Sequence, residues 1–346
     1  MLMKTRNIIA GVAFLMVTGS LLLTNCKKDS STTSSNSSLT SQQTTQVQNS
    51  DAQDAIADKT EEDVDNNLDE LQNNNYTVST AKSAFGGLND TVVITVDHPD
   101  TTTFPKVVTI WYYSYQDSSN NEPITKDGEI IVTIDRANAS HPLLISRAIV
   151  FNDFKITTDS TTLILNGTRT VNRVKAVLKL TNLAVAKTSV TDDITSAMKF
   201  AVVTTGNTDT LTFTRNVNRT RIAIAYYKNV NYVAGQTTLY NLKHLRFKHL
   251  PSLDALKYTG TVTGFNERDS AYTKTITDTL VIKVFKGSPV ITIGTMTYSV
   301  GTALYDISFK EDPSHPHFTL VTVTNEQTGK TKSFDRRFGR KFNKWW

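Results

Sequence analysis

The stretch TLTFTRNV (Thr210–Val217) alternates between polar and apolar side chains, with Leu211, Phe213 and Val217 opposite threonine and asparagine. The stretch EIIVTID (Glu129–Asp135) repeats this pattern, and its isoleucine and valine side chains face one way. A period of two indicates a β-strand with one buried and one solvated face. We therefore expect β-strands at both places.

Many further short runs rich in Thr, Val, Ile and Tyr are separated by Asn, Asp and Gly. They include Val92–Val96, Val107–Tyr112, Leu143–Phe151, Thr162–Leu165, Ile222–Tyr227, Thr259–Thr263, Leu280–Phe285, Val290–Ile293 and Phe318–Val323. This spacing predicts an all-β fold, built mainly as an antiparallel sandwich or as an extended twisted meander. No alternation of strands and helices occurs, which argues against a nucleotide-binding α/β fold.

Three segments precede the β-rich part. Residues 1–25 have the pattern of a signal peptide, and the Ser/Thr-rich residues 26–50 predict a disordered tether. Residues 51–75 predict a short acidic helix with a thin apolar stripe, which either packs weakly on the basic body or forms a charged stalk. Residues 76–346 then form the β-rich domain, in one or two subdomains.

Charge is unevenly distributed along the chain. The formal net charge is +5, but residues 1–75 carry 5 basic and 10 acidic side chains, so the excess of positive charge belongs to residues 76–346. A basic body is compatible with anionic lipid headgroups, acidic glycans or nucleic acid, or simply with a solvated basic surface.

The N-terminal leader ends at the only cysteine of the chain, Cys26. Lys4 and Arg6 precede an apolar run, Ile8–Leu23, which is long for a signal peptide and short for a membrane-spanning helix. A plain transmembrane anchor is the alternative. The sequence Leu23-Thr24-Asn25-Cys26 resembles the lipobox of bacterial lipoproteins, with Asn25 where Gly, Ala or Ser is usual.

This resemblance implies acyl chains on Cys26, which would make the membrane a partner and place the protein at the outer membrane, lipid-anchored on its periplasmic or surface-exposed face. A second resemblance covers about 90–220. It is to uncharacterised β-rich lipoproteins of Bacteroidota, and is carried by FPKVVTI at 104–110, DGEIIVT at 127–133, FNDF at 151–154 and NGTRTVN at 166–172. It implies a β-rich lipoprotein and no particular activity.

Few residues suggest a ligand. The aromatic cluster Trp111, Tyr112, Tyr113 and Tyr115 is a candidate sugar-binding platform. His315-Pro316-His317, with Asp312, is the one metal-like cluster of the sequence, but zinc sites need three or four ligands in defined geometry, so we predict no metal. No nucleophile, metal-protease or phosphate-loop motif occurs, and we predict no cofactor.

The C-terminal segment combines cations with aromatic residues. We single out Arg336, Arg337, Arg340, Lys341, Trp345 and Trp346 as candidate membrane or anion contacts. The alternatives are a final strand that caps the core, or nucleic-acid stacking, which the expected location disfavours.

The sequence therefore favours a lipid-anchored cell-envelope protein with a non-enzymatic binding or structural role. Its partners would be the membrane, through Cys26, and envelope proteins or glycans, with no nucleic acid. The alternative is a surface glycan-handling protein, either an accessory carbohydrate binder or a glycoside hydrolase.

Overall fold

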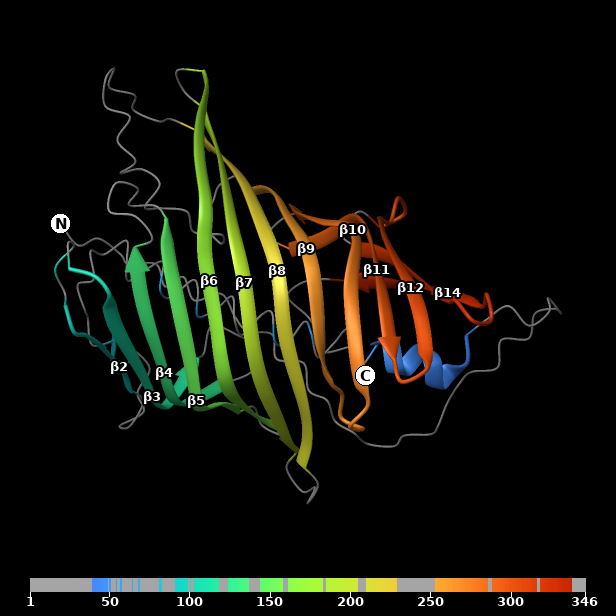
Figure 1. Ribbon diagram of the computed structural model, residues 1–346, viewed down its shortest axis with the longest axis horizontal. Helices are drawn as coiled ribbons and strands as arrows, with labels where there is room; N and C mark the ends of the chain where they lie inside the picture. Colours follow the sequence, from blue (N-terminus) through green and yellow to red (C-terminus); the bar gives the residue numbers. More distant parts are fainter. Residues whose placement is uncertain are drawn as a thin grey trace.

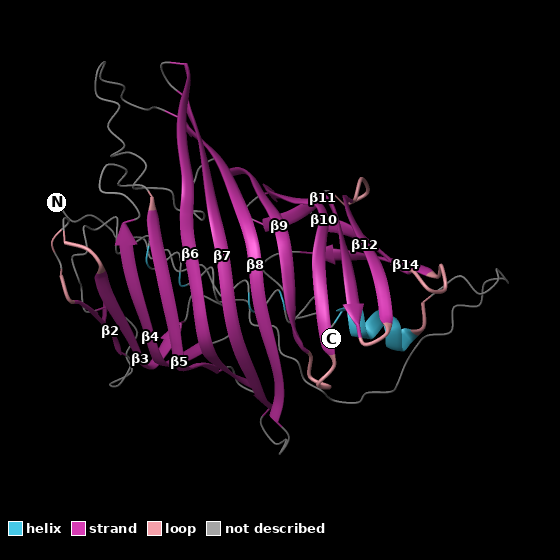
Figure 2. Cartoon of the chain, viewed as in Figure 1, coloured by secondary structure: helices cyan, strands magenta, loops and turns pink. Residues whose placement is uncertain are grey.

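The structure, a computed structural model, describes part of the 346-residue chain. The described residues are 39–48, 50, 54, 57, 64, 68, 81–82, 91–98, 100, 103–117, 124–136, 144–157, 161–182, 185–204, 210–228, 253–285, 288–315 and 318–337. Figure 1 and Figure 2 show them as one broad, twisted sheet with a helix beside its C-terminal strands.

In the described part of the chain, fourteen strands form one antiparallel sheet, in which each strand pairs with the next one along the chain. Their bounds are β1 Ala81–Lys82, β2 Thr91–Val96, β3 Lys106–Asp117, β4 Ile124–Arg136, β5 Ile145–Thr157, β6 Thr161–Asn182, β7 Val185–Thr204, β8 Thr210–Lys228, β9 Leu253–Phe265, β10 Ala271–Phe285, β11 Ser288–Val300, β12 Ala303–Glu311, β13 Phe318–Asn325 and β14 Thr331–Arg337. The all-β prediction is confirmed. Of the two architectures considered, the chain forms the extended twisted meander.

Two β-bulges change which side chains point inward. The register of β3 against β4 shifts between Tyr112 and Tyr115, and that of β5 against β6 shifts between Phe151 and Phe154. Ser114 and Asp153 lie at these shifts with φ of 45°. An extra residue bends the strand and increases its twist, and it also reverses the alternation of the side chains that follow.

Residues 41–48 form a helix, as does Ser50, inside the segment predicted as a disordered tether. That prediction is wrong from residue 41 onward. The cause is a capping box, in which the Gln43 N–H donates to the Thr40 hydroxyl at 3.2 Å and the Thr40 N–H donates to the Gln43 side chain at 3.1 Å. This reciprocal pair satisfies two amide groups that a helix N-terminus otherwise leaves unpaired.

One side of this N-terminal helix is buried. Asp54, Ala57, Val64 and Leu68 are also helical, and they are at most 8% exposed. With Val47 and Ser50 they recur at the intervals of three, four or seven residues that place side chains on one helix face. The described part of the predicted acidic helix therefore packs on the sheet.

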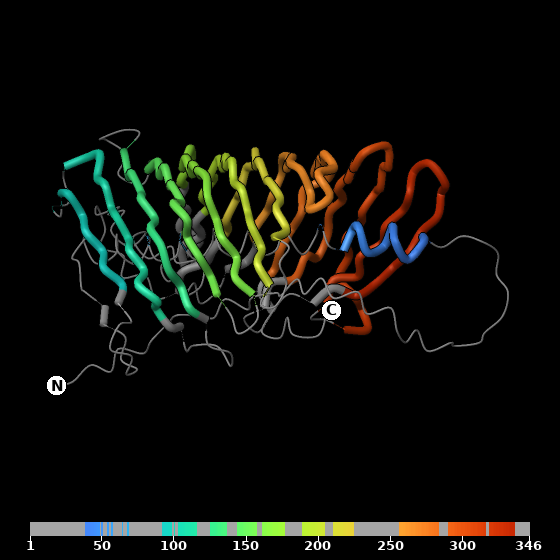
Figure 3. Tube along the Cα trace, turned by 90° about the horizontal axis from the view of Figure 1, so that it is seen from below, coloured from blue at the N-terminus to red at the C-terminus, as the bar shows by residue number. Residues whose placement is uncertain are grey.

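The described helical residues contact different parts of the sheet, from its C-terminal strands to its N-terminal strands. Leu39 and Val47 belong to a hydrophobic cluster made by strands β6 to β14, whereas Ala57, Val64 and Leu68 belong to one made by β2 to β8. Figure 3 shows residues 39–50 lying across the last strands. Because the central strands β6, β7 and β8 contribute to both clusters, the core lies on one face of one continuous sheet.

Within the described residues, no helix is long and apolar enough to cross a membrane.

Candidate functional site

The buried face of the sheet carries many charged side chains. The most buried are Lys106, Lys126, Arg147, Arg169, Arg215, Arg221 and Lys274, together with the carboxylates of Asp54 and Asp192. A buried charge is tolerated only when it is paired or hydrogen bonded. The partners of these groups therefore show what the charges do.

Asp54 of the helix joins two strands that are not neighbours. Its Oδ1 accepts a hydrogen bond from Arg215 Nε of β8 at 3.0 Å, and its Oδ2 accepts one from Lys274 Nζ of β10 at 2.6 Å. The same Lys274 ammonium donates to the carbonyl oxygen of Ser50 at 2.9 Å. We call Ser50, Asp54, Arg215 and Lys274 the helix–sheet cluster. It fastens the helix to the sheet across β9.

Electrostatics keep the helix–sheet cluster charged. Burial alone would raise the pKa of Asp54, but Lys274 and then Arg215 lower it, and the net effect is a pKa well below the ordinary value. Burial raises the pKa of Tyr272, and the Asp54 carboxylate raises it further. Lys274 Nζ also lies 5.3 Å from the ring centre of Tyr298. Asp54 and Tyr272 therefore do not exchange a proton near neutral pH.

A second buried cluster joins the three longest strands. Asp192 of β7 accepts from Arg173 Nε of β6 at 2.9 Å and from Arg221 Nη2 of β8 at 2.8 Å. Burial opposes its ionisation, but Arg173 and Arg221 hold the pKa of Asp192 well below its usual range. We call these three residues the strand cluster. It is a cross-strand ladder that contributes to the rigidity of the sheet centre.

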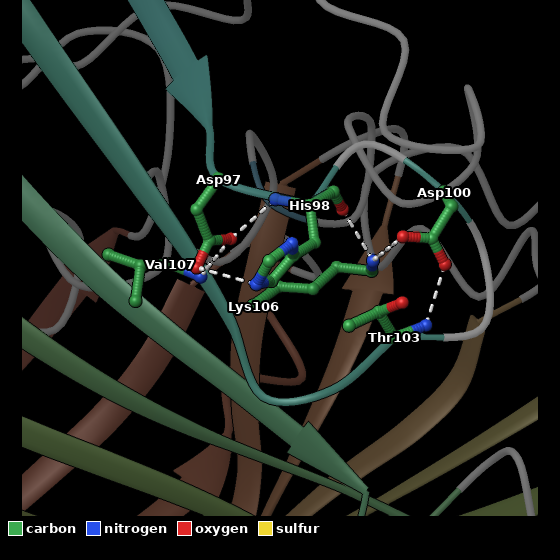
Figure 4. Close-up of polar contacts among 6 residues, drawn as sticks. All are labelled: Asp97, His98, Asp100, Thr103, Lys106 and Val107. Carbon is green, nitrogen blue, oxygen red and sulfur yellow. Dashed lines mark hydrogen bonds and ion pairs between the residues drawn. The ribbon is translucent and has the colours of Figure 1, made fainter.

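Lys106, which is fully buried, organises the loop between β2 and β3 (Figure 4). Its Nζ donates to the carbonyl of His98 at 2.5 Å and lies 4.0 Å from Asp100 Oδ2. Asp100 in turn accepts the Thr103 N–H at 2.6 Å, and Asp97 accepts the His98 N–H at 2.7 Å. All of these contacts lie within the connection between β2 and β3, so the role of Lys106 is to hold this connection in place.

Beside the helix–sheet cluster lies a cavity of about 130 Å³. Its lining is Gln42, Thr45, Gln46 and Ser50 of the helix, Asn266, Glu267 and Arg268 of the β9–β10 turn, and Tyr298 of β11. Tyr298 is fully buried, and the Ser50 side chain lies beside its hydroxyl. Burial raises the pKa of Tyr298 to about 12, so this hydroxyl stays protonated.

The predicted aromatic platform does not form one face. Tyr112 and Tyr115 both point into the core, because the bulge between them reverses the alternation, and their ring centres lie 6.1 Å apart. Tyr112 is 6% exposed, while Tyr113 is 52% exposed and Trp111 is half-buried. The four side chains are therefore divided between core and surface.

The other predicted contacts lie at or beyond the ends of the described chain. Arg336 and Arg337 close β14, where they pair in register with Thr319 and Phe318 of β13. Arg340, Lys341, Trp345, Trp346 and the lipidation candidate Cys26 lie outside the described residues. The start of the C-terminal segment is thus a final strand, as one of the three interpretations predicted.

Asp335 of β14 joins Asp312 and His315, the two described members of the histidine cluster. His315 Nδ1 lies 2.8 Å from Asp312 Oδ2 and 4.0 Å from Asp335 Oδ2. Asp312 also accepts the Ser314 N–H at 2.8 Å, and this bond, followed by His315, lowers the pKa of Asp312. The arrangement closes the turn between β12 and β13. His317 lies outside the described residues.

Sequence reasoning missed both buried clusters, although a signal was present. Arg215 occupies a position of the same parity as the apolar Phe213 and Val217 of its strand. Asp192 likewise stands between Val190 and Ile194 at positions of alternating burial. A charged residue at an apolar position predicts a buried ion pair, because an unpaired charge there would be too costly.

Comparison with protein-family models, with curated proteins and with solved structures finds no match to this chain.

Proposed function

We propose that this chain is a lipid-anchored cell-envelope protein with a non-enzymatic binding or structural role. The observation that carries the proposal is the buried attachment of the N-terminal helix to the sheet through Asp54, Arg215 and Lys274. The helix begins 15 positions after Cys26, at Ser41. A lipid on Cys26 would therefore hold a rigid body through a short connection.

The geometry also supports an orientation towards the membrane. The tether predicted from composition now covers only residues 27–39, for which the r.m.s. reach is about 20 Å. Leu39, at the start of the helix, belongs to the hydrophobic cluster of the C-terminal strands, and Phe334 of β14 packs against that cluster. The basic and aromatic residues that follow β14 and the lipidated cysteine would thus meet the membrane at the same end of the sheet.

A lipid together with basic residues makes a stable anchor. A single acyl chain binds a bilayer marginally, and additional chains or a polybasic segment make the attachment durable. The C-terminal segment offers Arg340, Lys341 and Lys344 with Trp345 and Trp346, a composition suited to the interface of an anionic bilayer.

The electrostatics favour binding or structure over catalysis. A general acid or base works best with a pKa near the working pH. In the helix–sheet and strand clusters the pKa values are shifted further away from neutral pH. Asp54 and Asp192 therefore stay ionised, while Tyr272 stays neutral. Such fixed charges hold elements together.

The alternative, a surface glycan-handling protein, is supported by one observation. The cavity beside the helix has amide and hydroxyl side chains in its lining, whereas the aromatic cluster of β3 is divided between core and surface.

Membrane fractionation of a bacterial host tests the proposed anchor. The wild-type chain should incorporate labelled palmitate and sediment with membranes, and Cys26→Ala should lose the label and appear in the soluble fraction. A chain shortened after Phe338 should keep the label and dissociate more readily at high salt. If Cys26→Ala still sediments while its unfolding midpoint is unchanged, the lipid anchor is refuted.

A further inference from the structure

The turn between β12 and β13 and the strand β14 bring three metal-binding side chains together. One ligand atom from each of Asp312, His315 and Asp335 lies within 4.8 Å of the other two. Among the described residues, no other three histidine, cysteine, aspartate or glutamate side chains meet in this way. The sequence prediction of no metal did not include Asp335, because a later strand supplies this residue.

The three ligand atoms are spaced as a small metal ion requires. Zinc binds histidine nitrogen and carboxylate oxygen at about 2.0–2.2 Å, so the ligand atoms of a tetrahedral site lie about 3.3–3.6 Å apart. His315 Nδ1 is 2.8 Å from Asp312 Oδ2 and 4.0 Å from Asp335 Oδ2, and these two distances lie on either side of that range. Small rotations of the His315 and Asp335 side chains would therefore seat the ion.

The fold holds the ligands in place. The second carboxylate oxygen of Asp312 accepts the Ser314 N–H at 2.8 Å. The Phe318 N–H donates to the His315 carbonyl at 2.8 Å, and the two rings pack edge to face with their centres 5.5 Å apart. Asp335 is fixed by the pairing of β14 with β13. Contacts that orient metal ligands in this way raise the affinity of a site.

The types of ligand select a transition metal. Magnesium and calcium prefer oxygen ligands alone, whereas an imidazole nitrogen beside carboxylates suits zinc. The side chains of His315 and Asp335 are 60% and 40% exposed. An ion can therefore reach the site from solvent, and water can fill the remaining coordination position.

We propose that Asp312, His315 and Asp335 form a zinc site that joins β14 to the turn between β12 and β13. Among the described strands, β14 has a neighbour on one side only, so a metal ion adds a second attachment to the end of the sheet. The site goes beyond the proposed function, because it depends neither on lipidation nor on an envelope partner.

Calorimetric titration of the full, untagged chain in detergent tests the proposal, after treatment with a chelator and buffer exchange. Zinc chloride should bind saturably with one such site per chain, and an excess of magnesium or calcium should not displace it. Zinc at 100 times its dissociation constant should also raise the unfolding midpoint by about 5 °C or more.

Two variants locate the ion on the protein. Losing an outer partner of a metal ligand costs about 10- to 100-fold in affinity, so losing a ligand should cost at least as much. His315→Ala and Asp335→Asn should each weaken zinc binding by at least about 10-fold and abolish the rise in midpoint. Both side chains are partly exposed, so the midpoints in chelator should stay close to that of the wild type.

His98→Ala is the matched control. His98 is also an exposed histidine beside an aspartate, with Nε2 3.8 Å from Asp97 Oδ2, but among the described residues it belongs to no group of three such ligands. This variant should keep the affinity for zinc and the rise in midpoint. A loss of zinc binding in His98→Ala would contradict the assignment to the turn between β12 and β13.

Three further results would overturn the proposal. They are the absence of saturable zinc binding, zinc binding that His315→Ala and Asp335→Asn both leave unchanged, and displacement of zinc by magnesium or calcium, which would indicate only a diffuse acidic surface. None of them would bear on the membrane anchor, which fractionation of Cys26→Ala tests separately.

Discussion

Replacing Asp54 by asparagine should destabilise the fold strongly. The substitution keeps the shape of the side chain but removes the charge that faces Arg215 Nε at 3.0 Å and Lys274 Nζ at 2.6 Å. Because Arg215 is fully buried and Lys274 is 4% exposed, both cations would lose a buried counter-charge. Breaking a buried ion pair in this way costs about 3–5 kcal/mol.

Urea unfolding followed by circular dichroism measures this cost. The double variant Asp54→Asn/Lys274→Met removes both members of the shorter contact, and it should cost about 0.5–3 kcal/mol less than the sum of the two single variants. An additive double variant would show that the two side chains do not interact. A cost below about 1 kcal/mol for Asp54→Asn would refute the buried cluster itself.

The pH dependence provides an independent check. The pKa of Asp54 is lower in the folded than in the unfolded chain, so its stabilisation is complete above the unfolded value of about 3.9 and is lost as the pH falls below it. The difference in unfolding free energy between wild type and Asp54→Asn should therefore be constant from pH 7 to pH 5 and should become smaller by about 1.2 kcal/mol at pH 3. A difference in unfolding free energy that does not change with pH would contradict the ion pairing of Asp54.

Other substitutions test the remaining features. Asp192→Asn should cost about 3–5 kcal/mol, because Asp192 is fully buried between two arginines, while Asp193→Asn on the exposed face should cost less than about 0.5 kcal/mol by the same urea assay. Thr40→Ala should cost about 1 kcal/mol by removing the helix cap. Gly264→Ala should cost about 1–3 kcal/mol or more, since its Cβ would lie 2.0 Å from a carbonyl oxygen of β8, whereas Gly301→Asn, in open space at φ 56°, should be tolerated within about 1 kcal/mol in thermal unfolding.

Local sequence patterns predicted most of the strands, because each strand of a meander has one solvated and one buried face, but none of the predicted runs corresponds to β7 or β12. The alternation in Glu129–Asp135 and Thr210–Val217 corresponds directly to the buried positions of β4 and β8. The patterns did not separate a sandwich from a single sheet. Whether the chain forms a sandwich or a single sheet depends on what packs on the buried face. Part of what packs there is a helix whose first turn lies in a segment with almost no apolar residues.

The same limit explains the missed site. Asp54 lies 161 residues before Arg215 and 220 before Lys274, so no local pattern links them. The position of Arg215 nevertheless predicts that it is buried, because it alternates in step with the apolar Phe213 and Val217. A buried arginine in turn requires an acidic partner. Among the described strand residues, Asp192 is the buried carboxylate, and the acidic segment before the sheet supplies Asp54. The opposite charges of residues 1–75 and 76–346 are complementary at Asp54, because this carboxylate of the acidic segment is buried against Arg215 and Lys274 of the sheet.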